Sequence, residues 1–363
     1  MPRIAVLLPE QERFSPNAAH AIALLARVMA RPRDGMAPVV YGAGVAVPFG
    51  DVAFEPVARP WRPFQTGSRY AAGATEAIGR ALPDLIEVHD QPDLALHLAR
   101  KFPKVPVTLF LHNDPQAMRQ AQTAEQRSFL LARLALVAPV SAYVRDRLLE
   151  GVSTRARVEV FANFVDLAAM PAPQPQKCIL FAGRVAADKG ADSFVAACGR
   201  ALKLLPGWRA EIVGADDPSW PGVDAAFIAS ITQEADAANV GMLGWRPHVD
   251  VLHAMARAAI VVVPSRLPEP FGLAALEAMA CGAALLCAPR GGLAEVMGDA
   301  ALPINPDDPA TIAANIVALA LDRPRRAALS RAGLARAAQF SAEDALARLS
   351  AMRSLVLREW PRA

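Results

Sequence analysis

Long apolar segments are missing from the sequence, although 53% of its 363 residues are hydrophobic. A helix that crosses a membrane needs about 20 consecutive apolar residues. The strongest apolar run, 258–263, ends at Pro264 and is typical of a buried strand. Glu10 interrupts the apolar start of the chain too early for a secretory signal. We therefore expect a cytoplasmic protein.

Cysteine and metal-binding motifs are scarce as well. The four cysteines are scattered, with no C-x-x-C pair and no histidine cluster beside them, which disfavours a zinc site or a disulfide framework. Asp-x-Asp, which commonly holds a metal at nucleotide-sugar sites, does not occur, and neither does a P-loop or Gly-x-Ser-x-Gly. Gly42 and Gly44 begin a dinucleotide fingerprint that lacks its third glycine. We expect no metal and no cofactor, and a nicotinamide-dependent dehydrogenase is a weak alternative.

What the chain does contain is a regular alternation of short apolar runs and longer helical patterns, which is typical of parallel α/β sheets. In the first half we expect strands at 4–8, 39–41, 85–88, 107–111, 136–139 and 158–161. In the second half we expect them at 178–182, 209–213, 241–243, 259–263, 284–287 and 301–304.

Two sheets of this kind imply two domains, and the stretch 170–176, with three prolines, resembles the linker between them. We place the domains at 1–170 and 171–340. The segment 341–360 forms a final amphipathic helix, because its apolar residues recur at helical spacing and need a surface to cover.

Net charge is only +3, but its distribution is uneven. Residues 1–170 carry 19 Lys and Arg against 16 Asp and Glu, whereas the remainder is balanced. This excess suits two readings: ordinary solvated helix faces, or a surface for an anionic acceptor or for membrane headgroups. Much of it lies in one part of the chain, at Arg119, Arg127, Arg133, Arg145, Arg147, Arg155 and Arg157.

Chemically distinctive residues follow the predicted strands of the second half, where ligands of doubly wound sheets bind. Gly183 follows one strand, and Arg184 and Lys189 direct two cations to the same region, which suits a diphosphate. Glu269 follows another strand, and Glu277 lies in the apolar helix after it. A carboxylate there needs donors, such as ribose hydroxyls. Backbone amides that start this helix can donate to sugar or phosphate, at Phe271, Gly272 and Leu273.

As an ordered set, these motifs resemble the family 4 glycosyltransferases. The resemblance rests on Gly183-Arg184 with Lys189-Gly190, on Glu269-x7-Glu277 with Phe-Gly-Leu after the first glutamate, and on Gly291-Gly292-x-x-Glu295. It implies a GT-B fold, in which two Rossmann-like domains face a central cleft, with the nucleotide-sugar donor held by 171–340 and the acceptor by 1–170. It also implies that the final helix, within 341–363, packs back on the first domain.

The same resemblance assigns roles to residues. Arg184 and Lys189 would bind the diphosphate, Glu277 the ribose and Glu269 the hydroxyls of the transferred sugar. The loops at Gly214 and at Trp245-Arg246 look like the family's base-binding loops. In the first half, His89 and the His112-Asn113 pair resemble the family's strand-end histidine segments, with His112 contacting the sugar.

One departure concerns the loop after the first strand, where many relatives carry Gly-Gly. This chain has Pro9-Glu-Gln-Glu-Arg-Phe-Ser-Pro-Asn17 there, so Ser15 and Asn17 become candidate acceptor contacts and helix caps.

The resemblance implies a retaining, metal-independent transferase, with Glu269, His112, Arg184 and Lys189 as the catalytic candidates. Its partners would be a nucleotide sugar and a saccharide or lipid-linked acceptor of the cell envelope, with peripheral association at the inner face of the membrane and no nucleic acid. An epimerase or a phosphorylase on the same scaffold, or a non-catalytic sugar-nucleotide binder, are the alternatives.

Overall fold

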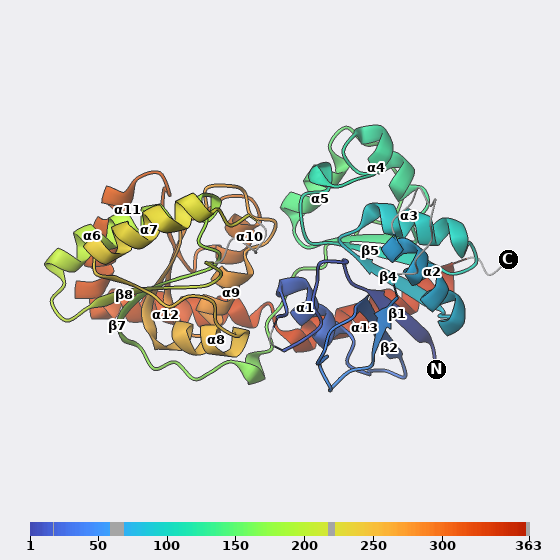
Figure 1. Ribbon diagram of the computed structural model, residues 1–363, viewed down its shortest axis with the longest axis horizontal. Helices are drawn as coiled ribbons and strands as arrows, with labels where there is room; N and C mark the ends of the chain where they lie inside the picture. Colours follow the sequence, from blue (N-terminus) through green and yellow to red (C-terminus); the bar gives the residue numbers. More distant parts are fainter. Residues whose placement is uncertain (17, 59–68, 217–221, 361–363) are drawn as a thin grey trace. The chain divides into compact units, whose positions relative to one another are not determined.

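The computed structural model describes residues 1–16, 18–58, 69–216 and 222–360 (Figure 1). The chain separates into two compact units, one of residues 1–163 with 342–363 and one of residues 164–341. The division falls between Asn163 and Phe164, ahead of the proline-rich stretch from which we placed it at residue 170. No helix among the described residues is long and apolar enough to cross a membrane.

The first unit is built on a parallel sheet whose strands run in the order β3-β2-β1-β4-β5-β6. This is the order of a dinucleotide-binding Rossmann sheet, in which the chain reverses direction beside the first strand. Strands are paired in register, for example Val6 with Val40 on one side and with Glu87 on the other. The strands are β1 (Arg3–Leu7), β2 (Ala37–Ala43), β3 (Phe54–Val57), β4 (Leu85–His89), β5 (Val107–Leu111) and β6 (Leu136–Pro139).

Helices cover both faces of this sheet, and the last helix of the chain is one of them. α13 lies beside α1 and the sheet of the first unit (Figure 1). Its buried residues Leu349, Met352 and Val356 recur at helical spacing and face the sheet. The helices of the unit are α1 (Ala21–Met29), α2 (Arg69–Ala81), α3 (Pro92–Lys101), α4 (Ala124–Leu131), α5 (Ala142–Leu149) and α13 (Ala342–Glu359).

A buried ion pair joins α13 to the centre of the sheet. The Arg353 guanidinium donates two hydrogen bonds to the Glu87 carboxylate of β4, with Nε–Oε1 at 2.8 Å and Nη2–Oε2 at 2.7 Å. The two side chains are only 5% and 1% exposed. Burial of charge is costly unless geometry and pairing are good, and the two-point contact meets that requirement. The chain therefore returns to the first unit through a specific polar contact as well as an apolar one.

The second unit repeats the same plan, with the strand order β12-β11-β10-β7-β8-β9. Helices α6, α7 and α11 pack on one face, and α8, α9 and α12 on the other (Figure 1). The strands are β7 (Gln176–Ala182), β8 (Arg209–Val213), β9 (Val240–Met242), β10 (Ala258–Val263), β11 (Ala284–Cys287) and β12 (Leu302–Pro303). The helices are α6 (Ala191–Ala201), α7 (Ala225–Ala237), α8 (His248–Arg257), α9 (Leu273–Ala280), α10 (Gly292–Met297), α11 (Pro309–Leu321) and α12 (Arg323–Ala338).

Three features of the first unit differ from the sequence predictions: one predicted strand, one strand that was not predicted, and one predicted helix cap. The run 158–161 forms no strand of its own and makes only an isolated bridge, Val137 to Val158, beside β6. The edge strand β3 was not predicted, because it is four residues long and contains Pro56, which cannot donate to a ladder. Ser15 does not cap α1, whose N-cap is His20, and Asn17 lies outside the described residues.

Candidate functional site

In the second unit, the predicted donor residues gather on loops that follow the carboxyl ends of β7 and β10. Lys189 Nζ lies 2.5 Å from Glu269 Oε1, and Ser265 Oγ donates to the same carboxylate oxygen at 2.7 Å. Both charged side chains are largely covered, at 25% and 15% exposed. The structure thus brings the proposed diphosphate cation and the proposed sugar-binding carboxylate into direct contact.

Glycines allow these loops to approach one another closely. A Cβ on Gly190 would lie 2.1 Å from the carbonyl oxygen of Pro264, at the end of β10. Gly272 precedes α9 with φ of 102°, and a Cβ there would lie 2.2 Å from Leu293. Both positions therefore require glycine, because any side chain would push the loops apart. The glycines singled out in the sequence thus position Lys189 and the start of α9.

The start of α9 offers unpaired backbone donors. Within the described chain, the N–H groups of Phe271, Gly272 and Leu273 donate to no carbonyl or side chain. Such groups at a helix N-terminus favour an anion or an oxygen-rich ligand. They follow Glu269 directly in the chain, so amides and carboxylate belong to one loop.

Arg184 takes a different conformation from the one its proposed role needs. Its Nη2 donates to Asp188 Oδ2 at 3.0 Å and its Nη1 donates to the carbonyl oxygen of Gly222 at 3.0 Å. The side chain is 33% exposed, so solvent screens this ion pair strongly. A diphosphate would have to compete with the partly exposed Asp188 carboxylate and the Gly222 carbonyl for the guanidinium.

Glu277 is buried and has a partner that the sequence did not reveal. His248 Nε2 lies 2.7 Å from Glu277 Oε1, and the glutamate side chain is 9% exposed. Burial opposes the charged form of His248, but the hydrogen bond and charge of Glu277 outweigh it, so the pKa of His248 is raised above its usual value. His248 directly follows Trp245-Arg246-Pro247, and that closeness to a predicted loop was the signal available in the sequence.

A second set of residues missed by the sequence argument braces the same loops. The Arg266 guanidinium holds Asp192 with two bonds of 2.6 and 2.7 Å and donates to the carbonyl oxygen of Ala187 at 2.8 Å. The backbone N–H of Arg266 donates to the carbonyl of Asp188 at 2.8 Å. One arginine therefore ties the loop that carries Lys189 to the loop that carries Glu269.

The predicted base-side loops lie next to each other at the ends of β8 and β9. Gly214 N–H donates to the carbonyl oxygen of Gly244 at 3.1 Å, and a Cβ on Gly214 would lie 1.9 Å from the carbonyl oxygen of Gly183. Trp245 and Arg246 follow Gly244, with Arg246 Nη1 donating to the Trp245 carbonyl at 3.0 Å. The three loops that follow β7, β8 and β9 thus converge through glycine backbones.

In the first unit, the two strand-end histidines form a pair at the ends of β4 and β5. His89 Nδ1 lies 2.9 Å from His112 Nε2, and both rings are buried. The outer ring nitrogens, His89 Nε2 and His112 Nδ1, have no hydrogen-bond partner among the described residues. A buried polar atom without a partner is unusual and marks a place where a ligand atom or water would bind.

Burial lowers the pKa of both histidines. For His89 the charges of His112 and Arg353 lower the pKa further, to well below its usual value. For His112 burial is partly opposed by the carboxylates of Asp90 and Glu12 and by a polar contact with the side chain of Asn163, all of which raise the pKa. Both rings are therefore neutral at pH 7, and each can offer its outer nitrogen as a donor or an acceptor, depending on the tautomer.

The remaining acceptor-side candidates lie around this pair. Asp90 receives the backbone N–H of His112 at 2.8 Å and the side-chain amide of Asn113 at 2.6 Å, so it fixes both residues that follow β5. Ser15 is buried in the loop after β1. In the same loop Glu12 is 5% exposed and accepts the backbone N–H of Ala23 at 3.2 Å. No motif in the sequence indicates Glu12.

Family models match nearly the whole of this two-unit chain. Residues 166–336 match the glycosyl transferases group 1 model, and residues 18–169 match the glycosyltransferase family 4 model. The chain belongs to the group 1 glycosyltransferases. Its fold is GT-B, as the motifs predicted. The boundary between the two matches lies close to the division between the units.

Curated relatives match this group 1 chain over part of their length. A D-inositol 3-phosphate glycosyltransferase of Segniliparus rotundus is 33% identical over 46% of this chain and 37% of its own. An O-antigen chain mannosyltransferase B of Escherichia coli is 41% identical over 28% of this chain and 26% of its own. A glycogen synthase of Mycobacterium tuberculosis is 29% identical over 70% of this chain and 64% of its own. The chain thus spans less than two thirds of each relative's length.

Solved structures resemble the group 1 chain over its full length. Sucrose-phosphate synthase from Thermosynechococcus elongatus has a TM-score of 0.79 at 19% identity, covering 99% of this chain and all of its own. The Anabaena protein HepE, solved with UDP and glucose, has a TM-score of 0.79 at 18% identity, covering 98% of this chain and all of its own. At sequence identities this low, the structural similarity establishes the fold alone.

Proposed function

We propose that the protein is a retaining glycosyltransferase that moves a sugar from a nucleoside-diphosphate sugar to a hydroxyl acceptor without a metal ion. The observation that carries the proposal is the contact of Lys189 with Glu269 beside the amides that begin α9. A cation, a carboxylate and free amides in one place suit a ligand that combines an anion with hydroxyl groups.

Charge neutralisation of the leaving diphosphate is the main task of the site. Lys189 and Arg184 supply two positive charges, and the amides of α9 add the positive end of a helix dipole. Each cation is held by a carboxylate in the structure, so the donor has to replace Asp188 as the partner of Arg184 and to share Lys189 with Glu269. No divalent cation is required for this part of the reaction.

The two glutamates divide the rest of the donor between them. Glu269 would accept hydrogen bonds from the transferred sugar, and Glu277 would accept them from the ribose. The base of the nucleotide would lie against the Gly214 and Trp245-Arg246 loops. Glu269 is engaged by Lys189 and Ser265 through one oxygen, which suits a hydrogen-bonding role better than attack on carbon. Displacement on the face of the departing phosphate, which then takes the acceptor proton, is consistent with retention.

The acceptor side is assigned to the first unit, with His112 contacting the transferred sugar through the free ring nitrogen. His89, Asn113, Ser15 and Asn17 are its proposed neighbours. Two relatives act, by their names, on an inositol phosphate and on an O-antigen chain. On this basis we propose a saccharide or lipid-linked acceptor of the cell envelope, reached from the cytoplasm.

A direct test measures product and stereochemistry together. Purified protein is given UDP-, GDP- and ADP-sugars with and without candidate acceptors, while nucleoside diphosphate release is recorded. We expect release that depends on the acceptor and a product with the donor's anomeric configuration, visible by NMR. Inverted product would refute retention, release of free nucleotide-sugar epimer would indicate an epimerase, and binding without turnover would indicate a sensor.

A further inference from the structure

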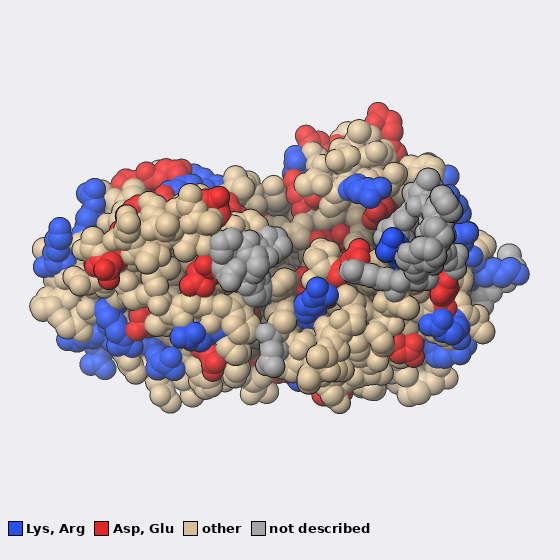
Figure 2. Space-filling model, viewed as in Figure 1, with Lys and Arg blue, Asp and Glu red and all other residues tan. Residues whose placement is uncertain are grey.

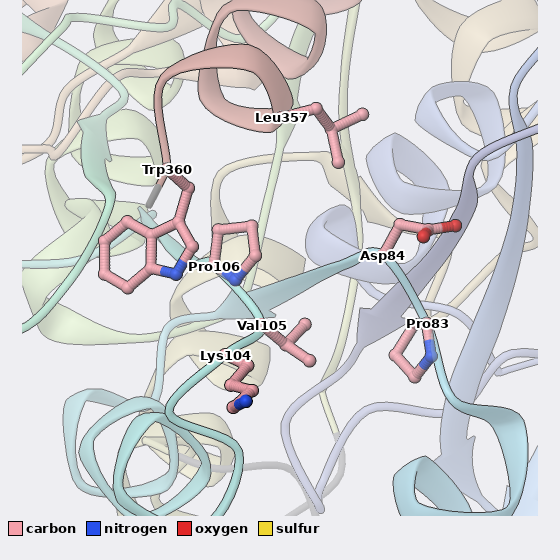
Figure 3. A pocket seen from close by; sticks show the side chains of 7 residues that line it. All are labelled: Pro83, Asp84, Lys104, Val105, Pro106, Leu357 and Trp360. Carbon is pink, nitrogen blue, oxygen red and sulfur yellow. The ribbon is translucent and has the colours of Figure 1, made fainter. Parts of the chain in front are cut away.

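A hollow at the amino-terminal edge of the first sheet lies apart from the proposed donor-binding and acceptor-binding residues, and three arginines of the uneven charge noted in the sequence, Arg133, Arg155 and Arg157, line it. It has three lobes of about 280, 560 and 270 Å³, all of which Trp360 lines. Figure 3 shows the first lobe, with Leu357 and Trp360 at the end of α13 on one side and Lys104 and Pro83 on the other. Pro83-Asp84, Val105-Pro106 and Ala135 each come directly before β4, β5 and β6. The histidine pair follows the opposite ends of these strands.

Basic side chains line all three lobes, and several have no acidic partner. Within the described chain no carboxylate pairs with Arg100, Lys104 or Arg155. Arg133 lies over the ring of Phe129, 3.3 Å from its centroid. Figure 2 shows basic side chains on the first unit, at the right of the view.

Acidic side chains in the hollow are already engaged. Asp84 accepts the backbone N–H of Arg3 at 2.8 Å. Asp93 lies 3.9 Å from Arg119, and Glu359 lies 2.6 Å from Arg157. Five Lys and Arg side chains line the three lobes against three Asp and Glu side chains, so the surplus positive charge is local. Arg127, Arg145 and Arg147 also belong to the excess of basic residues in the first half of the sequence. By contrast with the cations of the hollow, they are bound to carbonyls or carboxylates elsewhere.

Exposed apolar side chains accompany these cations. Phe129 is 48% exposed, and Leu82, the neighbour of Pro83, is 63% exposed. Leu82 has a φ of 47°, a conformation that is unfavourable for a leucine, so neither burial nor backbone preference explains it. With the half-buried Trp360, this edge combines an aromatic amphipathic group, apolar side chains and free cations.

We propose that this edge is a docking surface for a membrane that contains anionic lipids. Free cations near such a surface each contribute attraction, aromatic residues settle at the headgroup level, and lysine and arginine stems lie along apolar surface. A soluble polyanion would use the cations but would gain little from Leu82 and Phe129. The inference rests on the proposed function for its purpose, which is to bring the protein to a lipid-linked acceptor.

The position of the surface constrains that acceptor. Strands of five residues separate the docking edge from the histidine pair, a distance of about 17 Å at the usual rise of a strand. A lipid docked at one edge would present its reactive hydroxyl at the other only through an extended headgroup. We therefore infer an acceptor whose reactive sugar is well removed from its lipid.

Vesicle co-sedimentation without donor or acceptor tests the docking surface apart from catalysis. We expect binding to vesicles of phosphatidylcholine with phosphatidylglycerol, weak binding to phosphatidylcholine alone, and loss in high salt. The double variant Arg100→Gln with Lys104→Gln should bind about 25-fold more weakly, at roughly five-fold for each cation. The control, Lys203→Gln with Arg323→Gln, removes the same charge from exposed sites of the second unit and should bind as the wild type does.

A second measurement separates a membrane from other polyanions. Brominated lipids should quench tryptophan fluorescence in the wild type, and less so in Trp360→Phe, while thermal unfolding of all variants stays unchanged. Equal binding by the patch and control variants would overturn the proposal, as would absence of binding to anionic vesicles. Binding to heparin that matches vesicle binding and ignores Trp360→Ala would indicate a soluble polyanion instead. None of these outcomes depends on turnover, so the proposed transferase activity stands or fails separately.

Discussion

At the scale of single residues, the contact between Lys189 and Glu269 and that between His248 and Glu277 distinguish two glutamates that look alike in sequence. Glu269 lies before α9 and shares one oxygen between Lys189 and Ser265. Glu277 lies inside α9, is buried, and is held by an imidazole. The first carboxylate thus belongs to the proposed sugar and diphosphate end of the donor, and the second to its ribose end.

This difference predicts that substitution of the two glutamates changes different kinetic constants. Sugar contacts can strengthen as the ring flattens in the transition state, whereas ribose contacts stay nearly constant. We expect Glu269→Gln to lower kcat mainly and Glu277→Gln to raise the donor KM mainly, each by about 10- to 100-fold for one charge-assisted bond.

Calorimetric titration with the free nucleoside diphosphate provides the check on this division. The diphosphate should bind normally to Glu269→Gln and poorly to Glu277→Gln. An equal loss of diphosphate affinity in both variants would show that the roles are not divided in this way.

The raised pKa of His248 predicts a pH-dependent contribution to stability. Because the folded pKa lies above the usual 6.5, protonated His248 stabilises the folded state fully below about pH 6.5. The contribution is then lost as the pH rises through the folded pKa. We expect the difference in Tm between wild type and His248→Gln to be largest near pH 6 and to shrink toward pH 9. A difference that is constant over this range would argue against a charged His248.

Residue roles were predicted from the sequence where a motif carried them, and missed where only folding did. Gly190 and Gly272 were singled out as motif glycines, and the structure gives the reason in their close backbone contacts. His248 and Arg266 were missed, because their partners Glu277 and Asp192 lie far along the chain. Glu12 was missed, because its contact is with the backbone N–H of Ala23. Such pairs have no local signature.

At the scale of elements, α13 depends on the two-point ion pair of Arg353 with Glu87. Arg353→Leu would leave Glu87 buried without a partner, and we expect the first unit to lose about 3–5 kcal/mol of its free energy of unfolding. Chemical denaturation of the variant, followed by a probe in the first unit, measures this loss. The double variant Glu87→Leu with Arg353→Leu should recover most of it, because no unpaired charge remains. A single variant as stable as the wild type would show that the pair contributes little.

Element positions were predictable in proportion to the regularity of their sequence. Strands at 107–111, 136–139, 209–213 and 284–287 were predicted with the bounds observed. Three of them are largely apolar runs, and 209–213 lies between the turn residues Pro206-Gly207 and Gly214. The edge strand β3 was missed, because its four residues include Pro56, and 158–161 was predicted as a strand although it only accompanies β6. Edge segments are half solvated, so an apolar pattern specifies them poorly.

At the scale of the whole molecule, both units have the same strand order, and only the second holds the proposed cations for the diphosphate. This asymmetry predicts that activity survives excess EDTA, since Arg184 and Lys189 supply the charge that a metal would otherwise bring. Initial rates with and without the chelator are compared, with Arg184→Ala and Lys189→Ala as variants that should lose activity. Loss of activity in EDTA that Mg²⁺ or Mn²⁺ restores would refute metal independence.

The return of α13 to the first sheet also has a consequence for synthesis on the ribosome. Glu87 is made early, but Arg353 follows only after the whole second unit, residues 164–341, has been translated. At about 5–20 residues per second, the nascent first unit waits roughly 10–50 s with a carboxylate and an apolar sheet face uncovered. The second unit, continuous in sequence, can complete its own core first. A released fragment that ends at residue 341 should therefore show a protease-resistant second unit and a first unit that needs chaperone protection.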